Sequence, residues 1–210
     1  MNILCINTCL KESDVSVIKD DGIYSAKRYT NLQHSITLMS QIEEALEKAE
    51  ITKNELDYIA VCVGTGSFTG IRIGLSVAKG LANALNIKII PFDTLTLLAY
   101  NTANADFVAF KGVGDDLYVA DMISPTETKN MRLTKIQDFE NALNSDDVVS
   151  SCDDLALSNC RLYKIHDVKI GYLPMSFLDK AKDSGEIEPI YLRLPQAEMQ
   201  KRCNDDRKGN

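Results

Sequence analysis

The 210-residue sequence predicts an α/β protein made of two similar halves, each a mixed sheet with flanking helices. Three observations lead to this prediction. Hydrophobic periodicity gives the same order of strands and helices in both halves. A glycine-punctuated loop at residues 64–70 joins an apolar strand to a helix. The composition, with 45% hydrophobic and 25% charged residues, supplies enough apolar material for a core.

The first half reads as three strands followed by alternating helices and strands. Apolar alternation predicts strands at 2–7, 14–19 and 23–29, with a turn at Asp20-Asp21-Gly22 before the third. A helix is predicted over 31–49, where Thr30 and Gln33 fit a capping box. The remaining elements are a strand at 57–63, a helix that ends at Asn86, a strand at 87–91 and a helix that begins at Asp93.

The second half repeats this order. Its predicted elements are strands at 106–111, 116–123 and 126–133, a helix at 134–144, a strand at 147–150, a helix at 153–161, a strand at 168–172 and a helix at 174–184. Two copies of the order predict tandem ribonuclease-H-like domains, the architecture of the actin-like ATPase superfamily. We place them at 1–103 and 104–193, followed by a polar tail at 194–210; the alternative is a single α/β domain.

Charge and composition narrow the class of protein. A net charge of −7 argues against a chain that holds nucleic acid by itself, because binding the phosphate backbone needs clustered Lys and Arg. No window approaches the ~20 apolar residues of a membrane span, and the first residues lack a basic, cleavable leader, so we expect a cytoplasmic protein. The six cysteines form no CxxC pair, which disfavours a disulfide framework or a zinc ribbon.

The stretch 64–76, GTGSFTGIRIGLS, carries the most information. Gly64 and Gly66 permit a tight turn, and the helix that follows presents unpaired N–H groups at its start. The spacing nevertheless fails the tests for phosphate binding. No Gly-Lys-Ser/Thr follows at the P-loop offset, and the third glycine of GxGxxG would fall on Thr69. The sequence therefore does not predict an ordinary nucleotide loop.

This loop closely resembles the GPGSFTGLRIG signature of the TsaB (YeaZ) family. The matching residues are Gly64, Gly66, Ser67, Phe68, Thr69, Gly70 and Arg72. Residues 3–9 are similar to the family's ILAIDTS, residues 33–35 to an RxHSE-like helix start, residues 91–99 to the segment around VSTLEALA, and residues 189–193 to a PxYLR close. The resemblance implies a non-catalytic subunit of the bacterial machinery that installs threonylcarbamoyladenosine on tRNA.

Two positions depart from that pattern. Asn7 stands where the family usually has Asp, and the segment that contains Lys111 stands where many members have AxDAR. In actin-like kinases and ATPases, acidic residues on the first strand of each domain hold Mg²⁺ or polarise the attacking water. An amide and an ammonium group cannot do this. We therefore expect no metal or nucleotide cofactor on this chain, and the same two residues disfavour the rival hypothesis of an actin-like sugar or acid kinase.

A peptidase is the third hypothesis, with Ser67 or Thr69 as nucleophile. A serine nucleophile needs a base within hydrogen-bond reach, and the chain has only two histidines, His34 and His166. We interpret Ser67 and Thr69 as caps of the following helix. The histidines lie in different halves without HxxxH or HExxH spacing, so no metal site is predicted.

The helix after the loop carries two rows of small residues. One row is Gly70, Gly74, Ala78 and Ala82, and the other is Ser76, Gly80 and Ala84. Small rows allow close helix contact, either with the chain's own sheet or with another chain. We predict that the first row forms a partner-binding face together with apolar residues of the first helix; the face comprises Met39, Ile42, Leu46, Gly70, Gly74 and Ala78.

The resemblance also implies the partners. A catalytic subunit of the TsaD family is expected on this face, a TsaE-family ATPase is expected to join the complex, and metal and ATP are expected on those subunits. Threonylcarbamoyl transfer would take place at the adenosine beside the anticodon of ANN-decoding tRNAs, which this chain would contact only indirectly. Without a partner, the same face is expected to form a two-fold homodimer.

Overall fold

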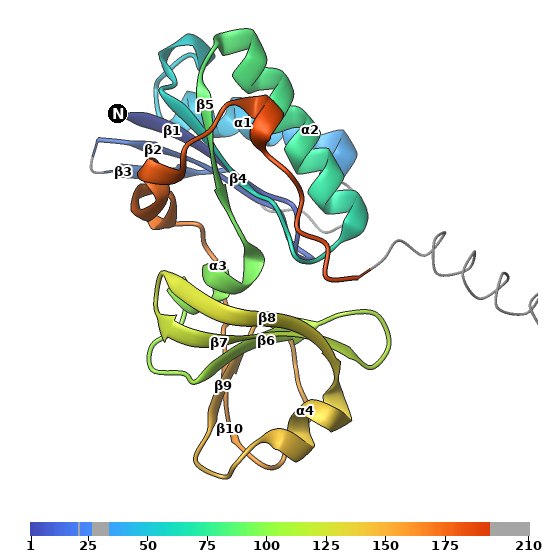
Figure 1. The fold of residues 1–210 in the computed structure, drawn as a ribbon. Coiled ribbons are helices and arrows are strands. Elements are labelled where there is room, and N and C mark those ends of the chain that lie inside the picture. The colour runs from blue at the N-terminus through green and yellow to red at the C-terminus, as the bar shows by residue number, and fades with distance from the viewer. Residues whose placement is uncertain (21, 27–33, 194–210) are drawn as a thin grey trace, which may run out of the picture.

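The computed structural model describes residues 1–20, 22–26 and 34–193 of the chain. They form an α/β structure with two mixed five-stranded sheets and flanking helices (Figure 1). The first sheet has the order β3-β2-β1-β4-β5 and the second β10-β9-β6-β7-β8. The strands are β1 (Asn2–Asn7), β2 (Asp14–Lys19), β3 (Gly22–Ser25), β4 (Tyr58–Cys62), β5 (Lys88–Phe92), β6 (Phe107–Lys111), β7 (Asp116–Ser124), β8 (Glu127–Lys135), β9 (Val148–Ser151) and β10 (Arg161–Lys164).

The two sheets have the same topology. In each sheet the first three strands of the half form an antiparallel meander, β1-β2-β3 in one sheet and β6-β7-β8 in the other. Two further strands then lie parallel to the first strand of the meander on its other side, β4 and β5 beside β1, and β9 and β10 beside β6. The duplicated strand order predicted from the sequence is therefore confirmed. The predicted α/β class is confirmed as well.

Helices α1 (His34–Lys48) and α2 (Phe68–Leu85) cover one face of the first sheet. Each buries a stripe against it, with Leu38 and Ala45 of α1 and Ala82 of α2 in the same core as Leu4 and Ile59. The shorter helix α4 (Ile136–Ala142) buries Phe139 against the second sheet. None of the helices within the described ranges could cross a membrane.

Two segments cross from one half of the chain to the other. Helix α3 (Thr94–Tyr100) follows the first sheet but packs Leu95 and Leu98 into the core of the second, and Figure 1 shows it between the sheets. The 3-10 helix η3 (Leu173–Lys180) follows the second sheet but packs Leu173 and Phe177 against the first. Because each core is completed by the other half, the two sheets hold one another in place. The predicted boundary at 103/104, just after α3, stays a prediction.

The C-terminal part of the chain differs from the sequence prediction. The expected helix at 153–161 is wrong: the segment is irregular up to β10, with Leu155 buried in the core and Leu157 and Cys160 partly buried against it. The expected strand at 168–172 is wrong, because the Ile170 amide donates to the Asp14 carboxylate and not to a neighbouring strand. The expected helix at 174–184 is the 3-10 helix η3, which is kinked at Phe177, and a second short 3-10 turn, η4 (Ser184–Glu186).

Other expectations are shortened or lie outside the described residues. Strand β3 ends at Ser25, and the capping pair Thr30 and Gln33 and the tail 194–210 fall outside the described ranges. A short 3-10 turn, η2 (Lys53–Glu55), precedes β4.

Candidate functional site

The glycine loop lies between β4 and α2 and is filled by the chain's own backbone. Gly64 and Gly66 have φ angles of 118° and 140°, which side chains rarely adopt. A Cβ at Gly64 would clash with the Ile190 carbonyl, one at Gly66 with the Cys9 carbonyl, and one at Gly70 with the Thr8 carbonyl. The glycines therefore allow the end of β1 and the segment around Ile190 to lie directly on the loop.

Hydrogen bonds fix this arrangement. The Ser67 amide donates to the Cys9 carbonyl at 2.9 Å, and the Thr8 hydroxyl donates to the Gly70 carbonyl at 2.6 Å. The Ser67 hydroxyl accepts from the Gly70 amide at 3.1 Å, which confirms Ser67 as the cap of α2. Thr69 is not a cap, because it is an exposed residue within the first turn. The glycines and the cap of this loop therefore serve the packing of the chain's own backbone.

A cleft of about 900 Å³ opens beside the loop, between the two sheets. Asn7, at the end of β1, and Lys111, at the end of β6, both line it. Asn7 is buried and its Oδ1 accepts from the Cys9 amide at 3.0 Å, so the side chain supports its own turn. Lys111 is exposed at the end of β6. The cleft therefore carries an amide and a cation at the two positions where phosphoryl transfer in actin-like kinases and ATPases needs carboxylates.

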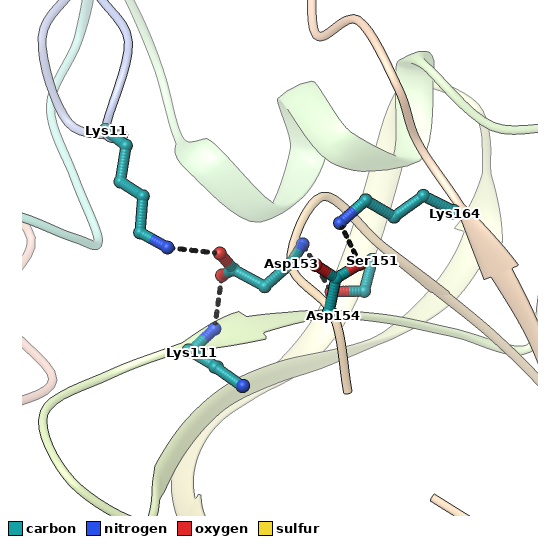
Figure 2. A network of polar contacts seen from close by, with 6 residues as sticks. All are labelled: Lys11, Lys111, Ser151, Asp153, Asp154 and Lys164. Atoms are coloured by element: carbon teal, nitrogen blue, oxygen red, sulfur yellow. Dashed lines mark hydrogen bonds and ion pairs between the residues drawn. The ribbon is translucent and has the colours of Figure 1, made fainter. Parts of the chain in front are cut away.

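A polar network joins the two halves across this cleft (Figure 2). Asp153, which follows β9, accepts from the Lys11 ammonium at 3.0 Å and from the Lys111 amide at 2.8 Å. Lys11 belongs to the turn between β1 and β2, and its bond to Asp153 raises the pKa of Lys11. The neighbouring Asp154 pairs with Lys164 at 2.7 Å, and this bond lowers the pKa of Asp154.

The network was not predicted from the sequence; the only signal was the adjacent pair of aspartates after a buried strand. Both carboxylates accept from cations of the chain. Across the described ranges, no three His, Cys, Asp or Glu side chains are placed to hold a metal ion. His166 is exposed on the cleft lining, and the side chain of His34 lies outside what the structure describes.

Of the cysteines that the structure describes, three are buried, and Cys152 and Cys160 are partly buried. Cys5, Cys9 and Cys62 are buried and free, and desolvation raises the pKa of Cys5 and of Cys9 well above the ordinary value for a thiol. Burial, with the nearby Asp153 charge, also raises the pKa of Cys152 to about 12. A raised pKa keeps the thiols of Cys5, Cys9 and Cys152 protonated near neutral pH, which disfavours these three as nucleophiles.

The predicted partner face is wrong in its orientation. Ile42, Gly70, Gly74 and Ala78 are buried within the chain, and a Cβ at Gly74 would clash with the Thr8 hydroxyl. Of the six predicted residues, Met39 is exposed and Leu46 is partly buried. The row of α2 that faces outward is the other one, Ser76, Gly80 and Ala84. Because both rows consist of small residues, the sequence does not distinguish which one packs on the sheet.

The fold matches a solved structure over nearly its whole length. YeaZ from Pseudomonas aeruginosa aligns with a TM-score of 0.73 and 19% identity, covering 91% of this chain and 99% of that chain. At this identity the likeness shows the fold alone.

The family is decided by sequence comparison. The model of the family TsaD, tRNA N6-adenosine threonylcarbamoyltransferase, matches residues 7–131. The TsaB protein of Buchnera aphidicola from Schizaphis graminum is 38% identical over 97 residues, which are 46% of each chain. The chain belongs to the TsaD family, and within it to the TsaB (YeaZ) proteins. The predicted resemblance is confirmed.

Further relatives include both TsaB proteins and tRNA N6-adenosine threonylcarbamoyltransferases. TsaB of Bacillus subtilis is 32% identical over 107 residues, covering 50% of this chain and 47% of the relative. A tRNA N6-adenosine threonylcarbamoyltransferase of Chlorobium limicola is 34% identical over 106 residues, covering 43% of this chain and 30% of the relative. The chain spans about half the length of the curated TsaB relatives it matches.

Proposed function

We propose that this chain is a non-catalytic subunit in the biosynthesis of threonylcarbamoyladenosine on tRNA, and that it acts by binding a TsaD-family catalytic subunit. The names of its relatives support the pathway. The observation that carries the non-catalytic role is the glycine loop, whose glycines admit the backbone of Thr8, Cys9 and Ile190 in close contact. The identical strand order of the two sheets supports the finer assignment to tandem ribonuclease-H-like domains.

The cleft supports the same conclusion. Phosphoryl transfer relies on carboxylates that hold Mg²⁺ between the phosphates and the protein. Asn7 and Lys111 cannot replace them, and both Asp153 and Asp154 accept hydrogen bonds from lysines. We therefore assign metal and ATP to the partners, including a TsaE-family ATPase. Because tRNA is the proposed substrate of the complex, we also propose that the protein acts in the cytoplasm. The kinase hypothesis would be restored by Mg²⁺-dependent ATP hydrolysis that survives repurification and disappears on substitution of Gly66.

The surface between α1 and α2 is the proposed site of the catalytic subunit. Ile36 and Met39 of α1 are 80% and 48% exposed, which is unusual for large apolar side chains of a helix that already buries a full stripe. The outward row of α2, Ser76, Gly80 and Ala84, lets another helix approach closely. We propose that this corrected face, and not the buried row predicted from the sequence, forms the heterodimer and, without a partner, a homodimer.

Gly80→Arg tests the interface. A Cβ at Gly80 would meet no atom within 4 Å, and replacing a helix-interior glycine gains up to ~1 kcal/mol, so the variant should fold with unchanged or higher stability. An unpaired charge in a close helix contact costs several kcal/mol, so association with the TsaD-family subunit should be lost. Sedimentation velocity of the chain alone and with the purified partner measures both homodimer and heterodimer.

Ile123→Arg is the matched control. Ile123 is 53% exposed on β7 of the second sheet, away from α1 and α2, so this charge should leave association unchanged. The interface lies elsewhere if Gly80→Arg sediments like the wild type, or if the control disrupts the complex to the same degree.

Contact with tRNA is proposed to be indirect. With a net charge of −7, the chain has no excess of cations to neutralise a phosphate backbone. A filter-binding titration at physiological salt should show retention of tRNA only when the catalytic subunit is also present. Micromolar binding by the chain alone, with a steep salt dependence, would contradict the proposal.

A further inference from the structure

Arg72 is held in a fixed position on the first turns of α2 by two aromatic side chains. Its guanidinium carbon lies 3.9 Å from the centroid of the Phe68 ring, and its Nε donates to the Tyr191 hydroxyl at 3.3 Å. The Phe68 and Tyr191 rings are in contact themselves, with centroids 4.8 Å apart. Tyr191 comes from the segment beyond η4, so residues far apart in the sequence fix this one cation.

The arrangement leaves the strongest donors of Arg72 unused. A guanidinium carries five N–H donors, and Arg72 donates one of them, from Nε. Within the described residues, no carboxylate forms an ion pair with Arg72, although it is exposed. Stacking on an aromatic ring fixes the planar fork without blocking its edge, which suits bidentate binding of a carboxylate or phosphate. Fixing the side chain in advance also removes part of the entropy cost of binding.

The position of Arg72 on the helix indicates which anion it meets. Arg72, Ser76 and Gly80 follow one another at intervals of four and are all exposed, so the guanidinium lies at the end of the outward row of α2. That row is otherwise uncharged. A nucleic-acid backbone is held by several clustered cations, whereas a single fixed guanidinium beside an uncharged helix row matches a single carboxylate on a protein.

We infer that Arg72, held by Phe68 and Tyr191, binds an Asp or Glu side chain of the TsaD-family partner at the edge of the α1–α2 interface. This inference rests on the proposed function and adds to it a specific polar anchor. Phe68 and Tyr191 act as positioning residues, because they orient the guanidinium and need not touch the carboxylate.

Calorimetric titration of the full chain with the purified TsaD-family subunit tests the inference. Arg72→Gln should weaken binding about 30-fold, since removing one member of a hydrogen-bonded interface charge pair commonly has at least this effect. Arg72→Lys should recover little, because a lysine lacks the planar fork, and Tyr191→Phe should weaken binding about 3-fold by releasing the guanidinium. Arg161→Gln, a charge-matched change on β10, should leave affinity within about 2-fold of the wild type.

The salt dependence separates an ion pair from a general structural effect. Between about 50 and 300 mM salt the wild-type affinity should fall, and the affinity of Arg72→Gln should fall less. Equal affinity of Arg72→Gln and wild type would overturn the inference and leave the proposed function intact, whereas a wild-type chain that does not bind the partner would overturn both.

Two further outcomes would also overturn the inference. If the effect of Arg72→Gln appears only when tRNA is present, the ligand is a phosphate. If the effect disappears in a chain that ends at Arg193, the guanidinium serves a carboxylate of the chain's own tail, which contains Glu198, Asp205 and Asp206.

Discussion

Three glycines of α2 provide a graded test of how the glycine signature works. Replacing each glycine by alanine adds the same methyl group to the same helix, but the methyl group has different neighbours at each of the three positions. At Gly80 the methyl meets nothing within 4 Å, at Gly74 it meets the hydroxyl of Thr8, and at Gly70 it meets the backbone carbonyl of Thr8. If the glycines exist to let the end of β1 lie against α2, stability should fall in that order.

The expected magnitudes follow from these contacts. Gly80→Ala should stabilise the protein by up to ~1 kcal/mol through helix propensity alone. Gly74→Ala forces the Thr8 hydroxyl to move and give up its bond to the Gly70 carbonyl, which costs about 1 kcal/mol, so the net change should be near zero. Gly70→Ala presses on backbone that cannot rotate away, and overpacking costs about 1–3 kcal/mol, so this variant should be the least stable.

Urea denaturation followed by circular dichroism measures the free energy of unfolding for all three variants and the wild type. The span from Gly80→Ala to Gly70→Ala should be about 2–3 kcal/mol, with unchanged denaturant slopes. Agreement of the three variants within about 0.5 kcal/mol would show that the close approach of β1 to α2 does not constrain these positions.

Other perturbations have equally defined outcomes. Asp121→Asn should lower the free energy of unfolding by about 1 kcal/mol at pH 7. Burial raises the pKa of Asp121, but hydrogen bonds from Arg132 and Asn130 outweigh this effect and lower the pKa below 3.8. The carboxylate therefore stabilises the fold above that pH, and this stabilisation is lost as the pH falls through the folded-state pKa. In urea melts, the difference in unfolding free energy between Asp121→Asn and wild type should shrink over that pH range. Lys11→Ala should change stability by less than about 1 kcal/mol, because its side chain is 77% exposed, and a larger loss would contradict this. Asp153→Ala should lower the free energy of unfolding by more than Lys11→Ala in the same urea melts, because the Asp153 side chain is only 12% exposed and also accepts a hydrogen bond from the Lys111 amide. Equal losses in the two variants would show that the bond from the Lys111 amide contributes nothing to stability.

The sequence by itself determined the features that depend on local periodicity and chain geometry. Alternating apolar residues predicted every strand of the first sheet and four of the five strands of the second, and the repeated order of elements predicted their shared topology. Strand β10 was missed, because all four of its residues are exposed and carry no apolar alternation. The offsets in the glycine loop excluded standard phosphate binding, and Ser67 was identified as a cap from its place before an apolar helix. Asn7 and Lys111 were identified on the first strand of each half as departures from the carboxylates of the resembled family, and the structure then placed both on one cleft.

Only the tertiary structure decided how these elements use their surfaces. The two small rows of α2 have the same composition, so the contact with Thr8, far away in the sequence, selects the row of Gly70 and Gly74 for the interior and leaves Gly80 outside. The crossing of α3 and η3 into the opposite cores, and the Lys11–Asp153 pair between the halves, depend on where the two sheets meet. Such contacts are set by the packing of distant surfaces, which no local pattern of apolar and polar residues records.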